Sequence, residues 1–88
     1  MFMGEENFKN ISIRAIVNDD PIGNLEDEDV YMVWFCKTLQ NAKGLFSTDK
    51  RRGVYWECTY NGDKNELYVD SYLKGYNKEW KLDAFQIK

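Results

Sequence analysis

The fold is decided by residues 53–73, which read GVYWECTYNGDKNELYVDSYL. Both sides of Asn61-Gly62 carry the aromatic and β-branched residues that are enriched in strands. An Asn-Gly pair between two such runs is the strongest short-range signal for a β-hairpin. The chain is therefore expected to build an antiparallel sheet around this hairpin.

The register of the hairpin is constrained by which side chains face each other. A two-residue loop at Asn61-Gly62 places Trp56 opposite Leu67, and a four-residue loop places Trp56 opposite Val69. Both registers keep apolar side chains on one face, because side chains alternate between faces along a strand. The Asn-Gly preference for mirror-type turns predicts a tight turn with a positive φ at Gly62.

Two further strands are predicted upstream of the hairpin. Residues 30–36, VYMVWFC, are apolar on both faces, which is typical of a strand that is central in a sheet or covered on both sides. Ala42 to Thr48 reads as a shorter strand, weakened by Gly44 because glycine has no side chain to pack.

Residues 5–18 fit two patterns. Helical spacing joins Phe8, Ile11, Ala15 and Ile16, whereas strand alternation joins Ile11, Ile13, Ala15 and Val17. A helix is favoured, because Glu5 and Glu6 suit the positive end of a helix dipole and Asn18-Asp19-Asp20-Pro21 ends it.

These elements predict one α+β domain over residues 1–88, with an N-terminal helix packed on a three- to four-stranded antiparallel sheet. An acidic leader (1–29) holds the helix at 5–18, residues 30–73 form the sheet, and a tail (74–88) docks as a fifth strand or a short helix. The residues expected to face the helix are Trp34, Val54, Trp56, Leu67 and Val69.

Composition predicts a soluble, cytoplasmic protein. No apolar run approaches the roughly 20 residues of a membrane span, so no membrane partner is predicted, and the first residues lack the pattern of a secretory signal. The net charge of −3 is uneven: residues 1–29 are strongly acidic, and residues 30–88 are mildly basic. Cys36 and Cys58 are expected to be reduced and shielded from solvent.

Part of the chain resembles a known family. VYMVWFCKTLQNAKGLFST (30–48) and GVYWECTYNGDK (53–64) resemble an uncharacterised family of small proteins from phages and prophages of Gram-positive bacteria. The resemblance implies a phage origin, a location in the host cytoplasm and a helical leader. It implies no known activity and no catalytic residues. The basic run 50–52 departs from the family, so any role read from it would belong to this protein.

No enzymatic activity and no cofactor are predicted. The chain has no histidine, the side chain that titrates nearest neutrality. Without histidine, two cysteines cannot make a Cys/His zinc set within one chain. Glu57 and Asp70 share the second face of the hairpin and can approach each other, but a polar outer face is the commoner reason for such a pair.

Protein binding is the predicted function. One helix cannot cover both faces of the sheet, so a face with tyrosines is left to bind a host protein, a phage protein or a second copy of the chain. Its candidate residues are Tyr31, Tyr55, Tyr68 and Tyr72. The alternative is single-stranded nucleic-acid binding, with aromatic rings stacking on bases and lysines or arginines on phosphates. Its candidate contacts are Lys37, Lys43, Lys50, Arg51 and Arg52.

Overall fold

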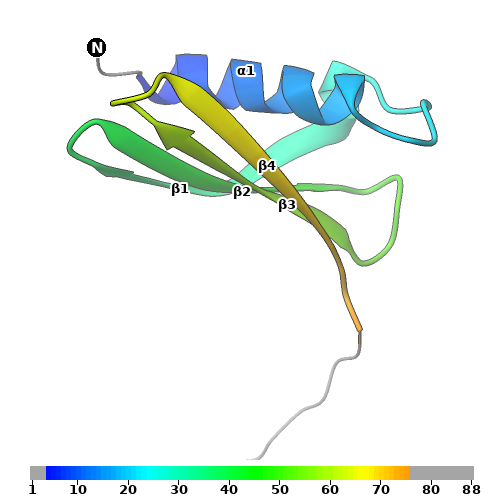
Figure 1. The fold of residues 1–88 in the computed structure, drawn as a ribbon. Helices are drawn as coiled ribbons and strands as arrows, with labels where there is room; N and C mark the ends of the chain where they lie inside the picture. Colours follow the sequence, from blue (N-terminus) through cyan, green and yellow to red (C-terminus); the bar gives the residue numbers. More distant parts are fainter. Residues whose placement is uncertain (1–3, 76–88) are drawn as a thin grey trace, which may run out of the picture.

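The computed structural model describes residues 4–75, which form one helix packed on a four-stranded antiparallel sheet (Figure 1). In chain order the elements are α1 (Glu5–Asn18), the short 3-10 helix η1 (Asp27–Asp29), β1 (Val30–Thr38), β2 (Asn41–Thr48), β3 (Val54–Asn61) and β4 (Glu66–Leu73). Each strand pairs with the next one along the chain. The predicted α+β architecture is confirmed. The predicted docking of the tail concerns residues 76–88, which lie outside the described residues.

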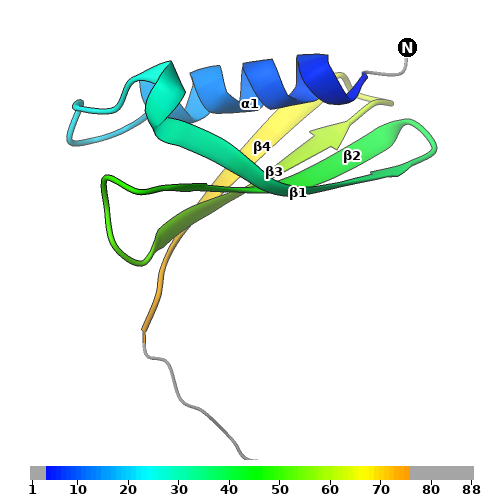
Figure 2. The same ribbon diagram turned by 180° about the vertical axis from the view of Figure 1, so that it is seen from behind.

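α1 has the predicted bounds and lies across one face of the sheet (Figures 1 and 2). Glu5 and Glu6 occupy its first turn, where the helix dipole favours negative charge. Its buried side chains repeat at helical spacing and are Phe8, Ser12, Ile13 and Ile16. Ile11 fits both the helical spacing and the strand alternation of the sequence, and in α1 it is 39% exposed.

The hydrophobic core lies between α1 and the sheet, around Phe8. The ring of Phe8 is fully buried, and its centroid lies 5.4 Å from that of Phe35 and 6.1 Å from that of Phe46. Gly44 makes this approach possible, because a Cβ at this position would lie 2.7 Å from the Phe8 ring. The glycine that weakens β2 as a strand is therefore the place where the helix packs against it.

Four of the five residues predicted to face α1 belong to this core. Trp56 is 6% exposed, and Val54, Leu67 and Val69 pack against the buried cluster. The fifth, Trp34, does not.

A β-bulge in β1 explains the position of Trp34. Met32 pairs with Phe46 and Trp34 pairs with Leu45, so Val33 has no partner of its own in β2. An extra residue of this kind breaks the alternation between the two faces of the sheet.

Beyond the bulge, β1 presents the other set of side chains to the helix. Phe35 packs on Phe8, whereas Trp34 and Cys36 lie on the side opposite α1. The prediction that Trp34 faces the helix is therefore wrong, and Trp34 is 42% exposed.

The β3–β4 hairpin has the predicted faces but a different register. Asn61 pairs with Glu66, so residues 62–65 form a four-residue loop, and Trp56 lies opposite Ser71. The observed register differs from the predicted ones by an even number of residues. Each side chain therefore keeps its predicted face.

The turn itself also differs from the prediction. The positive φ falls at Asn65, whose side chain accepts a 2.8 Å hydrogen bond from the Tyr60 hydroxyl, and not at Gly62. Gly62 is needed for its size, because a Cβ there would lie 2.1 Å from the carbonyl oxygen of Gln40. Its N–H donates to Oδ1 of Asn41 at 3.1 Å. The β1–β2 turn and the β3–β4 turn are therefore in contact at one end of the sheet.

Candidate functional site

The face of the sheet opposite α1 is the candidate functional site, and we call it the open face. Its residues follow from the pairing of the strands and are Tyr31, Trp34, Cys36 and Thr38 of β1, Asn41, Lys43, Leu45 and Ser47 of β2, Tyr55, Glu57, Thr59 and Asn61 of β3, and Glu66, Tyr68, Asp70 and Tyr72 of β4. The structure brings all four tyrosines of the predicted binding face, Tyr31, Tyr55, Tyr68 and Tyr72, onto this one surface. They are 36–50% exposed.

Three of these tyrosines form a row across the sheet. Tyr31 pairs with Ser47, Ser47 with Tyr55, and Tyr55 with Tyr72. The rings of Tyr55 and Tyr72 stack, with centroids 5.0 Å apart and planes inclined by 15°. Cross-strand stacking of this kind stabilises the sheet and also holds the two rings in fixed positions.

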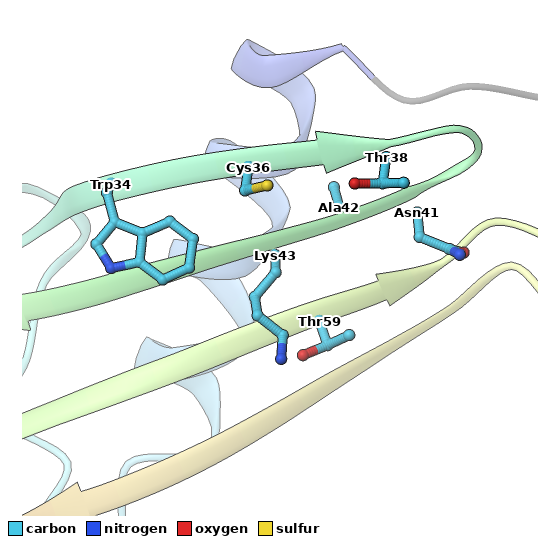
Figure 3. A pocket seen from close by; sticks show the side chains of 7 residues that line it. All are labelled: Trp34, Cys36, Thr38, Asn41, Ala42, Lys43 and Thr59. Atoms are coloured by element: carbon cyan, nitrogen blue, oxygen red, sulfur yellow. The ribbon is translucent and has the colours of Figure 1, made fainter.

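A shallow, mainly apolar groove of about 260 Å³ lies on the open face beside this row (Figure 3). Trp34 and Cys36 from β1, Lys43 from β2 and Thr59 from β3 line it. Figure 3 shows these side chains on the near side of the sheet, with the helix behind it.

Sequence reasoning missed Trp34 and Cys36 as members of this surface, because it assumed an unbroken alternation along β1. A signal was nevertheless present. Residues 30–36 are apolar on both faces, and one helix can cover only one of them.

Carboxylates give the open face its charge. Glu57 and Asp70 lie directly opposite each other on β3 and β4, which confirms that they can approach. Lys43 partly neutralises Glu57, with Nζ 3.8 Å from Oε2. Asp70 has no cationic partner among residues 4–75.

The pKa values of two tyrosines record this negative environment. Partial burial and the charges of Asp70 and Glu57 raise the pKa of Tyr72 above its ordinary value. Tyr68 donates a short hydrogen bond to the carboxylate of Glu66, which raises the pKa of Tyr68 in the same direction. Both hydroxyls are therefore neutral at physiological pH.

The five basic residues of the nucleic-acid alternative are not brought together. Lys43 is on the open face, whereas Lys37 pairs with Ala42 on the side that faces α1. The other three, Lys50, Arg51 and Arg52, lie in the turn between β2 and β3, and the first two of them are engaged with the loop that follows α1.

This engagement is an ion-pair network. Arg51 donates to both carboxylate oxygens of Asp20 at 2.5 Å and to Oδ1 of Asn24 at 2.6 Å. Lys50 donates to the carbonyl oxygen of Asn24 at 2.9 Å, and its Nζ lies 3.3 Å from a carboxylate oxygen of Asp29. The hydrogen bonds from Arg51 hold the pKa of Asp20 well below its usual range. Lys50 and Arg51 thus bind acidic groups of the chain itself.

The two cysteines are both free but lie in different environments. Cys58 is fully buried, and burial raises the pKa of its thiol to about 11. Cys36 is exposed. The prediction that both are shielded is right for Cys58 and wrong for Cys36, because the bulge moves Cys36 to the open face.

Residues 4–75 contain neither a metal-binding cluster nor a membrane-spanning helix. Histidine, cysteine and carboxylate side chains form no group of three or more that could hold a metal ion in this part of the chain. No helix there is long and apolar enough to cross a membrane.

Fold and site together define a small α+β protein with one helix on one face of an antiparallel sheet and an aromatic, acidic face opposite. The chain matches a family of unknown function (DUF6275) over residues 5–82, so it belongs to that family. This match confirms the part of the sequence resemblance that concerned an uncharacterised family. No match was found among curated proteins or among solved structures.

Proposed function

We propose that this chain is a phage-encoded accessory protein that acts in the host cytoplasm by binding another protein through its open face. The observation that carries the proposal is the set of exposed aromatic side chains on that face. Trp34, Tyr68 and Tyr72 are 42%, 50% and 42% exposed, although they lie on the same strands as the core. The phage origin and the cellular location rest on the sequence resemblance.

Tyrosine and tryptophan favour this role for a physical reason. Each presents a large, rigid apolar surface with a polar tip, so it gains much from burial in an interface and loses little side-chain freedom. Such residues are enriched among those that dominate binding energy. Because the stacked pair of Tyr55 and Tyr72 is already ordered, a partner would not have to order it.

The charges on the open face oppose nucleic-acid binding. Phosphates would meet Glu57, Glu66 and Asp70, while Lys43 is paired with Glu57. Two of the five candidate phosphate contacts, Arg51 and Lys50, are bound to Asp20 and Asp29. We therefore prefer a protein partner to single-stranded nucleic acid.

We also propose binding without catalysis. The carboxylates of Glu57 and Asp70 lie on a sheet face, and the side chain of Glu57 is paired with Lys43. This arrangement is that of a charged surface and lacks a positioned nucleophile.

The test is quantitative capture of partners from a lysate of a Gram-positive bacterium by the wild-type protein and by the Tyr55→Ala/Tyr72→Ala variant. The matched control is Ile22→Ala, which removes an exposed apolar side chain (67% exposed) in the loop after α1. Loss of an aromatic anchor typically weakens binding by about tenfold or more. We expect capture to fall by at least this factor in the tyrosine variant and to stay unchanged in the control.

The same proteins are tested for binding to single-stranded DNA at low and moderate salt. Binding to DNA with micromolar affinity, weakening steeply with salt, would contradict the proposal, because release of counterions from phosphates has this signature. Equal capture by the wild type and the tyrosine variant would contradict it as well.

A further inference from the structure

The open face also indicates what kind of partner it accepts. We infer that it binds a positively charged protein segment, in which an arginine reaches the Glu57–Asp70 pair and an apolar side chain about 10 Å away lies on Trp34 and Leu45. This inference rests on the proposed function and specifies the chemistry of the partner.

The charge of the open face is unbalanced. Among the open-face residues defined above, Glu57, Glu66 and Asp70 are acidic and Lys43 is the basic one, so the face carries a net charge of −2. Like charges directly opposite each other on neighbouring strands destabilise a sheet. Glu57 and Asp70 stand in this relation, and within residues 4–75 a lysine pairs with Glu57 but none pairs with Asp70. A cation supplied by a partner would remove the repulsion.

Aromatic rings surround these carboxylates. Asp70 lies between Tyr68 and Tyr72 on β4, and Glu57 follows Tyr55 on the same side of β3. Cations are attracted to the faces of aromatic rings, and a guanidinium also matches carboxylate oxygens with two parallel hydrogen bonds. Rings and carboxylates in adjacent positions favour arginine over lysine, because the planar guanidinium can use both.

The row of paired residues that contains the two carboxylates ends in apolar side chains. Asp70 pairs with Glu57, Glu57 with Leu45, and Leu45 with Trp34, so the row runs from acidic to apolar across the four strands. Strands lie roughly 4.8 Å apart, so Trp34 on β1 is about 10 Å from Glu57 on β3. Trp34 also lines the groove, so an apolar side chain of the partner that lies on Trp34 can extend into it.

The same charges disfavour the other occupants of this face. In a second copy of the chain, the carboxylates of one open face would meet those of the other if the two faces were superposed. An acidic protein or a nucleic acid would add further negative charge. A basic partner is the one whose charge complements Glu57 and Asp70.

The test uses the full chain and a synthetic peptide of three Arg-Phe-Gly repeats as the probe. Two matched peptides replace each arginine by citrulline, which has nearly the same shape without the charge, or by glutamate. Binding is followed by amide chemical shifts, which give the affinity and the location together. We expect the arginine peptide to shift the amides of the open-face residues. The citrulline and glutamate peptides should bind at least about tenfold more weakly.

The decisive variant is Glu57→Gln/Asp70→Asn, which neutralises the pair without changing its size. Its control is Glu28→Gln/Asp63→Asn, which removes the same charge at two exposed positions, one of them in the acidic segment 19–29. We expect the first variant to bind the arginine peptide at least about tenfold more weakly and the control to bind within twofold of wild type.

Several results would overturn the inference. They are shifts confined to segment 19–29, equal loss of affinity in the control variant, self-association through the open face in sedimentation, or no shift at millimolar peptide. If the citrulline peptide binds as well as the arginine peptide and Tyr55→Ala/Tyr72→Ala abolishes both, the basic partner is wrong while the proposed function stands. If neither Tyr55→Ala/Tyr72→Ala nor Glu57→Gln/Asp70→Asn changes peptide binding or lysate capture, both the basic partner and the proposed function are wrong.

Discussion

The two faces of the sheet are built from the same four strands, but they meet different surroundings. On the covered face, Phe46 and Cys58 are fully buried under α1. On the open face, Trp34 and Tyr68 are 42% and 50% exposed, and carboxylates stand between the rings. The covered face holds the hydrophobic core of the domain, whereas the open face leaves large aromatic side chains partly in contact with water. This contrast is the reason for locating function on the open face.

The largest expected effect is on stability and separates the two faces. Phe46→Ala empties a fully buried site and should reduce the free energy of unfolding by about 3–5 kcal/mol. Trp34→Ala removes a larger side chain, but from the open face. It should reduce the free energy of unfolding by less than about half of the loss expected for Phe46→Ala, because the Trp34 side chain already meets water. Urea unfolding followed by circular dichroism measures both. Equal costs would show that the open face is covered too.

A smaller effect is expected where the helix approaches the sheet most closely. Gly44→Ala places a methyl group 2.7 Å from the ring of Phe8 and should cost about 1–3 kcal/mol. Phe8→Leu shortens the opposing side chain, so the double variant should cost less than the sum of the two single variants. Strict additivity in this cycle would contradict the packing described for the covered face.

Some features of the fold have a clear signal in the sequence, and others do not. The bounds of α1 were predicted because Glu5, Glu6 and the 18–21 segment mark its two ends. The faces of β3 and β4 were predicted because their side chains alternate. The register was not, because loop length depends on the left-handed Asn65 and its bond with Tyr60.

Two features of the site could not be located from the local sequence. The bulge at Val33 falls in a strand that is apolar on both faces, so no break in alternation reveals it. Asp20 and Arg51 are 31 residues apart, and nothing in either segment identifies the other as its partner. The bulge exposes Trp34 and Cys36, and the ion pair with Asp20 removes Arg51 as a free cation. Lys50 is engaged in the same way by Asp29.

The ion pair between Asp20 and Arg51 predicts that the free energy of unfolding depends on pH. Asp20 lies near Trp56 and Ser71 at the end of the core, with its pKa lowered by Arg51. A lowered pKa in the folded state stabilises the protein fully above the ordinary value of 3.8, and this contribution is lost as the pH falls through the folded-state pKa. Asp20→Asn should therefore be less stable than wild type at pH 7, and the difference should shrink below pH 4.

Unfolding free energies at pH 7 and pH 3 measure this effect. Asp63→Asn, an exposed position in the β3–β4 loop, serves as the control and should follow the wild type at both pH values. A difference between Asp20→Asn and wild type that is the same at pH 7 and pH 3 would contradict the role assigned to the ion pair.

The most direct test of the contrast between the two faces is native-state labelling of the two thiols. Cys36 lies on the open face, and Cys58 lies in the core with a thiol pKa raised to about 11. Treatment with iodoacetamide followed by peptide mass spectrometry should show rapid labelling of Cys36. Cys58 should react only after unfolding, because it is inaccessible and its thiol stays protonated. Protection of Cys36, or comparable labelling of both cysteines in the folded protein, would contradict the account.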